Sequence, residues 1–164
     1  EIDKLTLHHS ATPHKAEDDL GQKLTNMQKW GERDRKWWDI PYHFVIDVDG
    51  TIYEGRDYNY AGDTNTGYDT RGHFLVNCYG NYNEQEPNKK QLEAIAGLMA
   101  WAAAENNMKE IKVYGHRDLA QTSCPGDNLQ EYVKNGTLKK MIKEKLDQGA
   151  PKAKWVSERP GSGS

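Results

Sequence analysis

The chain has 164 residues, enough for one compact domain with its own hydrophobic core. Hydrophobic residues make up 35% and charged residues 29%, which is polar for a globular protein, but five Trp and nine Tyr argue against disorder. The formal net charge of −3 gives no reason to expect a nucleic-acid partner or strong attraction to an anionic cell wall.

No membrane span is expected, because no apolar run approaches the ~20 residues that cross a bilayer. No signal peptide is expected either. The chain begins at Glu1 without Met, which fits a processed or trimmed product. Its two cysteines, Cys78 and Cys124, allow one disulfide but not a disulfide scaffold.

The first half of the chain alternates between strand and loop patterns. Residues 1–9 contain the alternating run Leu5-Thr6-Leu7-His8, which predicts a strand, and residues 10–21 form a loop. Residues 24–38 follow a helical phase and predict a helix that ends near 31–35. Strands are expected at 42–48 and 51–54, joined by a hairpin turn at Asp49-Gly50.

The second half begins with a long polar loop over residues 56–72, of a length that is usually functional or mobile. A strand is predicted at 73–79, and Asn88 is a suitable N-cap for a helix that runs to about 107. A strand at 111–114 and a helix at 129–146, interrupted near Gly136, complete the pattern. Residues 1–150 are therefore assigned to one domain and 151–164 to a C-terminal tail or linker.

These elements predict an α/β domain with a central mixed β-sheet flanked by about three helices. The sheet is expected to be mixed because the Asp49-Gly50 hairpin joins two antiparallel strands, while other strands are separated by helices.

The most specific local feature is a His116 and a Cys124 that lie eight residues apart after a predicted strand. Zinc binds imidazole nitrogen and thiolate sulfur readily, and a third ligand from the end of the first strand would leave the fourth position for water. An open position of this kind is typical of a catalytic site. The site is expected in a surface groove.

Strand alternation favours His8 over His9 as the third ligand. Leu5, Leu7 and His9 share one face of the strand and Thr6, His8 and Ser10 share the other, so the apolar face should meet the core. The alternatives are ordinary core or surface histidines, and a Cys78–Cys124 disulfide. Cys78 is in phase with Phe74 and Val76, which favours a position in the core.

Four stretches together resemble the type-2 N-acetylmuramoyl-L-alanine amidases, which include the bacteriophage lysozyme-type amidases and the animal peptidoglycan recognition proteins. They are Leu5-Thr6-Leu7-His8-His9-Ser10-Ala11-Thr12; Ile40-Pro41-Tyr42-His43-Phe44-Val45-Ile46 with Asp49-Gly50-Thr51-Ile52-Tyr53-Glu54-Gly55-Arg56; Tyr79-Gly80-Asn81-Tyr82; and Gly115-His116-Arg117-Asp118 through Cys124-Pro125-Gly126. Their order and spacing match over residues 5–145.

The resemblance implies zinc ligands at His8, His116 and Cys124 and an active-site tyrosine at Tyr42. Thr122 stands where the phage enzymes carry a lysine and where cleaving animal enzymes often carry threonine. Family members that only bind wall fragments often lose the cysteine, so Cys124 favours catalysis. Asp57-Tyr58 and residues 72–77 depart from the family pattern, and the recognition proteins' specificity for the third stem residue therefore does not transfer.

The resemblance thus implies zinc-dependent hydrolysis of the amide bond between N-acetylmuramic acid and L-alanine in peptidoglycan, with Tyr42 and Thr122 as catalytic residues. Possible substrate contacts are Tyr58, Tyr68, Arg71 and His43, although His43 also fits a structural role. The rival function is a peptidoglycan-binding module without catalysis. A monomer that acts on muramyl peptides is expected, secreted or periplasmic, or alternatively a phage lytic enzyme.

Overall fold

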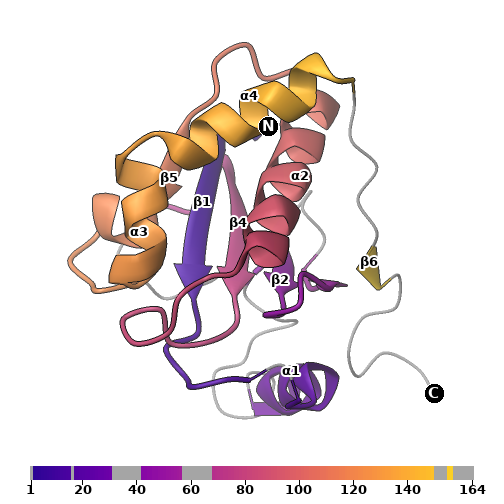
Figure 1. Ribbon diagram of the computed structural model, residues 1–164, viewed down its shortest axis with the longest axis vertical. Coiled ribbons are helices and arrows are strands. Elements are labelled where there is room, and N and C mark those ends of the chain that lie inside the picture. Colours follow the sequence, from indigo (N-terminus) through magenta and orange to yellow (C-terminus); the bar gives the residue numbers. More distant parts are fainter. Residues whose placement is uncertain (1, 16, 31–41, 57–67, 150–154, 157–164) are drawn as a thin grey trace.

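The computed structural model describes residues 2–15, 17–30, 42–56, 68–149 and 155–156 (Figure 1). Its centre is a six-stranded sheet with the order β5-β1-β4-β2-β3-β6. The bounds are β1 (Lys4–His9), β2 (Phe44–Ile46), β3 (Ile52–Glu54), β4 (His73–Cys78), β5 (Val113–Gly115) and β6 (Trp155–Val156). No helix among these residues is long and apolar enough to cross a membrane.

The sheet is mixed, as the sequence predicts. β1 pairs in parallel with β4 and β5, and β4 pairs in parallel with β2. β2 and β3 form the expected antiparallel hairpin, closed by a 2.8 Å hydrogen bond from Asp47 N to Thr51 O. Because β1, β2, β4 and β5 run in one direction, their carboxyl ends lie along one edge of the sheet.

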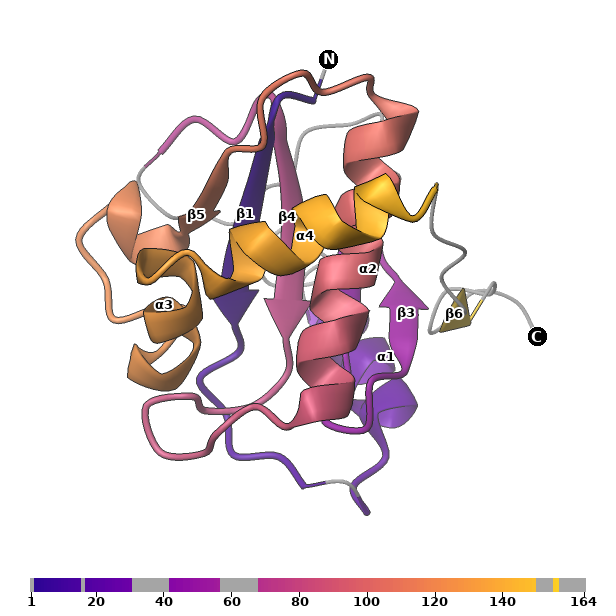
Figure 2. The same cartoon turned by 45° about the horizontal axis from the view of Figure 1, so that its top comes forward.

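Helices α2 (Lys89–Glu105), α3 (Asp127–Lys134) and α4 (Thr137–Asp147) cover one face of the sheet, with α4 crossing α2 (Figure 2). Asn88 caps α2 as predicted, and its side chain accepts a hydrogen bond from Gln91 N. The main core forms between these helices and the inward residues of the strands, including Leu5, Leu7 and Phe74, together with Ile95 and Met99.

The predicted break near Gly136 is confirmed, because this residue adopts a left-handed conformation between α3 and α4. The described residues therefore contain four α-helices rather than about three. The helix predicted at 24–38 is α1 (Leu20–Trp30), which begins four residues before the predicted start, and its predicted end near 31–35 lies outside the described residues. The Asp19 carboxylate explains the earlier start, since it accepts a 3.0 Å hydrogen bond from Gln22 N in the first turn.

The opposite face of the sheet is covered in part by α1. Leu20 and Leu24 pack against Val45 and Tyr79. Val45 lies on β2, between the main-core residues Phe44 and Ile46, and Tyr79 directly follows β4. The described residues of the predicted C-terminal tail lie at one edge of the sheet. Residues Trp155–Val156 pair in parallel with β3 as a two-residue strand, too short a segment for sequence periodicity to reveal.

Candidate metal centre

His8 occupies the second-to-last position of β1, at the carboxyl edge of the sheet. Leu5 and Leu7 point into the main core, so strand alternation turns Thr6 and His8 to the face that α1 partly covers. The ring of His8 is fully buried there, 4.6 Å from the ring of His116 and 5.2 Å from that of Tyr42.

His116 follows β5 directly and begins the short 3₁₀ helix η2 (His116–Asp118). The turn is closed by a hydrogen bond from Gly115 N to the Asp118 carboxylate, at 2.8 Å. A Cβ at Gly115 would lie 1.9 Å from the Gln130 Oε1 atom, so a larger residue there would displace the Gln130 side chain. The loop after η2 brings Cys124 back beside His116, because Arg117 N donates a 2.8 Å hydrogen bond to Cys124 O.

The ligand atoms of His8, His116 and Cys124 all lie within 4.8 Å of one another. The distance from His8 Nδ1 to Cys124 Sγ is 3.7 Å. Nitrogen and sulfur ligands of one tetrahedral zinc ion are roughly 3.6 Å apart, given bond lengths of about 2.1 and 2.3 Å. Two imidazoles and one thiolate therefore fit zinc in both chemistry and spacing, and they leave one coordination position for a water molecule.

Burial favours metal binding at His8 but opposes it at Cys124. Burial, followed by the nearby charge of His116, lowers the pKa of His8 well below its ordinary value, so its imidazole is neutral. Burial raises the pKa of the Cys124 thiol to about 12, although the His9 backbone amide opposes this change. The His9 amide donates a hydrogen bond to Cys124 Sγ at 3.3 Å, which favours the thiolate. A bound metal would hold Cys124 in this thiolate form.

Tyr42 lies next to His8, just before β2. Burial, with a smaller effect from Cys124, raises the pKa of the Tyr42 hydroxyl above its ordinary value, and the nearby Asn77 side chain lowers it again in part. The hydroxyl is therefore protonated at neutral pH and can donate a hydrogen bond. Thr122 is exposed two residues before Cys124, and its hydroxyl accepts a 3.2 Å hydrogen bond from Cys124 N.

The sequence matches the family model of the N-acetylmuramoyl-L-alanine amidases over residues 1–127. The chain belongs to this family. Among curated relatives, an N-acetylmuramoyl-L-alanine amidase of Mus musculus is 34% identical over 130 residues, which are 76% of this chain and 24% of that protein. Peptidoglycan-recognition protein SC2 of Drosophila melanogaster is 32% identical over 113 residues, which are 68% of this chain and 61% of that protein.

Solved structures support the same family. Drosophila peptidoglycan recognition protein SD has a TM-score of 0.72 at 30% identity, covering 81% of this chain and 79% of its own. The amidase LysC from Clostridium intestinale has a TM-score of 0.65 at 30% identity, covering 89% of this chain and 85% of its own. The amidase-family chain spans only about a quarter of the length of the mammalian amidases that it matches.

The residues expected to contact substrate have different positions in this amidase-family chain. His43 is buried, stacks on Phe74 and accepts a 2.9 Å hydrogen bond from Leu75 N, which fits the structural role. Arg71 is exposed just before β4, at the edge of the sheet away from His8, and forms an ion pair with Asp69. Tyr68 contacts His8 directly. Tyr58 lies outside the described residues.

Asn77 was missed in the sequence, although one polar residue in the apolar run of β4 was a usable signal. It pairs in register with His8 on β1 and with Val45 on β2, and its side chain is fully buried. Neither polar atom of its carboxamide makes a hydrogen bond of good geometry within the part of the chain that the structure describes. The Asn77 side chain lies close enough to Tyr42 to lower the pKa of its hydroxyl, so Asn77 is part of the surroundings of the candidate metal centre.

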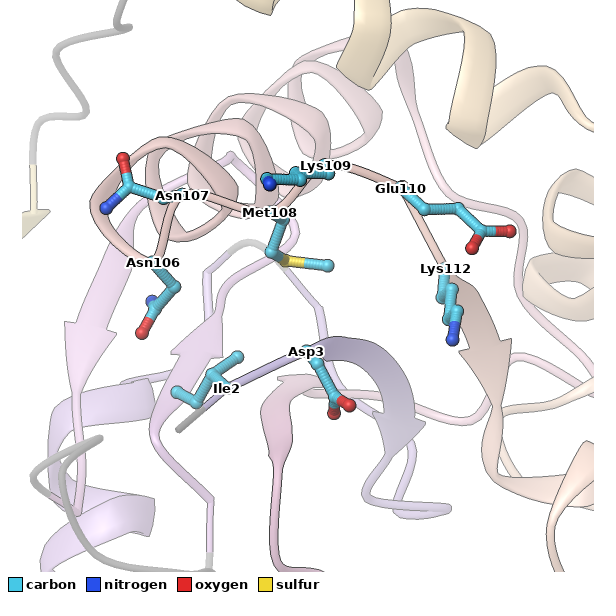
Figure 3. A pocket seen from close by; sticks show the side chains of 8 residues that line it. All are labelled: Ile2, Asp3, Asn106, Asn107, Met108, Lys109, Glu110 and Lys112. Carbon is cyan, nitrogen blue, oxygen red and sulfur yellow. The ribbon is translucent and has the colours of Figure 1, made fainter.

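A separate pocket of about 290 Å³ lies at the other end of the sheet (Figure 3). Ile2 and Met108 form its apolar part, and Asp3, Asn106 and Lys112 are among its polar lining residues. It precedes β1 and β5, whereas the metal-binding group lies at their carboxyl ends. The pocket therefore contributes nothing to the candidate metal centre.

Proposed function

We propose that this chain is a zinc-dependent amidase that hydrolyses the bond between N-acetylmuramic acid and L-alanine in peptidoglycan. The observation that carries the proposal is the meeting of His8, His116 and Cys124 beside a protonated Tyr42 hydroxyl. Three protein ligands with one position left for water are the arrangement of a catalytic zinc site.

The proposed chemistry is metal-assisted amide hydrolysis. When bound, zinc would supply an activated water molecule and polarise the scissile carbonyl. The Tyr42 hydroxyl would orient that water molecule or donate a hydrogen bond to the developing oxyanion. A single oxyanion donor typically raises kcat by roughly 10²–10³. The exposed Thr122 hydroxyl would add one neutral hydrogen bond from the rim of the site.

Names of related proteins support the substrate class. Several relatives are amidases or peptidoglycan recognition proteins. One similar structure, a Drosophila PGRP-LB variant at 27% identity and a TM-score of 0.70, is in complex with tracheal cytotoxin; it covers 80% of this chain and 79% of its own. We infer that the protein is a monomer that acts on muramyl peptides, with residues 1–150 as its amidase domain. It would act as a secreted or periplasmic enzyme or, alternatively, as a phage lytic enzyme.

The test is digestion of purified sacculi by the zinc-loaded protein, with mass analysis of the released fragments. Cleavage should separate intact stem peptides that begin with L-alanine from the glycan strands. The Cys124→Ser variant should have a much lower zinc content than the wild-type protein and should release no stem peptides. Cys78→Ala is the matched control, because the Cys78 thiol is buried and unlinked in the core and should leave zinc content unchanged.

The second candidate function is a peptidoglycan-binding module without turnover, and the likeness to recognition proteins favours it. Such a module would bind sacculi or muramyl peptides and release no stem peptides. A zinc-loaded protein that binds sacculi without cleaving them would therefore replace the amidase proposal with this one.

A further inference from the structure

Tyr68 lies near the end of the polar loop, five residues before β4 begins, and its hydroxyl is 2.9 Å from His8 Nε2. The two rings are close to parallel, with centroids 6.2 Å apart and an interplanar angle of 23°. On the other side of the imidazole, His8 Nδ1 is 3.7 Å from Cys124 Sγ. The two ring nitrogens of His8 therefore face different partners.

This arrangement assigns a role to each nitrogen. A neutral imidazole carries one N–H and one lone pair, and only the lone pair can bind a metal. Since Nδ1 faces Cys124, it is the nitrogen that can share a metal with this thiolate. The hydrogen then belongs on Nε2, where it is donated to the Tyr68 oxygen.

Neighbouring side chains hold Tyr68 in this position. The His73 ring packs edge-on against the Tyr68 ring, with centroids 5.2 Å apart. His73 is itself fixed by a 2.7 Å hydrogen bond between its Nδ1 atom and Thr6 Oγ1, and Thr6 lies two residues before His8 on the same face of β1. Contacts thus run from Thr6 through His73 and Tyr68 to His8.

The geometry points to Tyr68 as a positioning residue that fixes the tautomer and ring orientation of His8 for zinc binding. This inference rests on the proposed zinc function, and it replaces the expectation that Tyr68 contacts substrate. Partners of this kind on a ligating histidine typically contribute 10-fold to 100-fold to metal affinity or activity.

The decisive variant is Tyr68→Phe, which keeps the ring and removes the hydroxyl. Zinc affinity, measured by competition with a chromogenic chelator, should fall by roughly 10-fold to 100-fold. KM for a muramyl-peptide substrate at saturating zinc should stay within about twofold of the wild-type value. Tyr53→Phe is the matched control, since Tyr53 is a partly buried tyrosine on β3, two strands away from β4, and should leave zinc affinity unchanged.

Wild-type zinc affinity in Tyr68→Phe, together with a raised KM, would overturn the inference and return Tyr68 to substrate binding. An equal loss of affinity in Tyr53→Phe would also overturn it, because the effect would then not be specific to the His8 contact. A wild-type protein that binds no zinc would instead refute the proposed function, and the inference with it.

Discussion

Among single residues, Tyr42 offers the most direct test of the chemical step. Tyr42→Phe keeps the ring beside His8 and removes one hydroxyl. Because this hydroxyl is protonated at neutral pH, its loss should lower kcat by roughly 10²–10³, as for one oxyanion donor. Steady-state kinetics on a muramyl peptide, with zinc content and circular dichroism unchanged, would measure the effect. An unchanged kcat would assign Tyr42 to packing alone.

Thr122 should matter much less than Tyr42. Its exposed hydroxyl accepts a hydrogen bond from Cys124 N and can give one neutral bond to the substrate. A neutral hydrogen bond is worth about 0.5–1.5 kcal/mol net, so Thr122→Val should lower kcat/KM by roughly threefold to tenfold. Thr122→Ser, which retains the hydroxyl, is the control. A loss beyond a hundredfold in Thr122→Val would mean a larger role in the reaction.

At the scale of elements, two glycines precede α3 and α4 and differ in their surroundings. Gly126 has φ +93° and ψ 148°, and a Cβ there would lie 2.5 Å from the backbone carbon of Tyr82. Gly136 has φ +82°, with nothing within 4 Å of its Cβ position. The first position therefore combines backbone strain with a clash, while the second has strain alone.

Alanine at these two positions should separate the two effects. Gly136→Ala should lower the free energy of unfolding by about 1 kcal/mol. Gly126→Ala should lower it by roughly 2–4 kcal/mol, because the Tyr82 backbone cannot move aside easily. It should also weaken zinc binding, since the same turn holds Cys124 through the bond from Gly126 N to Ser123 O. Urea unfolding measures both free energies, and equal losses would contradict the assigned clash.

For the whole molecule, zinc should stabilise the fold by mass action. A ligand at 1,000 times its Kd adds about 4 kcal/mol to the free energy of unfolding. For a chain of this size, each kcal/mol shifts Tm by roughly 2–4 °C, so removal of zinc with a chelator should lower Tm by roughly 8–16 °C. Calorimetry of Cys124→Ser, with and without chelator, is the control and should show no shift. A similar shift in that variant would place the stabilising metal elsewhere.

The amino-acid sequence determined the features that depend on local periodicity. Alternation along β1 placed His8 on the face opposite Leu5 and Leu7, because side chains on a strand repeat every two residues. Asn88 and Gly136 marked helix ends through their own side-chain and backbone chemistry. The eight-residue spacing singled out His116 and Cys124, and the family pattern added Tyr42. Zinc binding by the first two and a catalytic role for Tyr42 stay predictions.

Tertiary structure decided which distant groups meet. The contact between Tyr68 and His8 depends on the path of the chain before β4 across the sheet, and no spacing in the sequence encodes that path. Asn77 gained its position from register with His8 and Val45 on two neighbouring strands. The pairing of Trp155–Val156 with β3 likewise requires an available sheet edge. Local patterns fix the direction of a side chain, whereas its partners are set by packing between segments far apart in the chain.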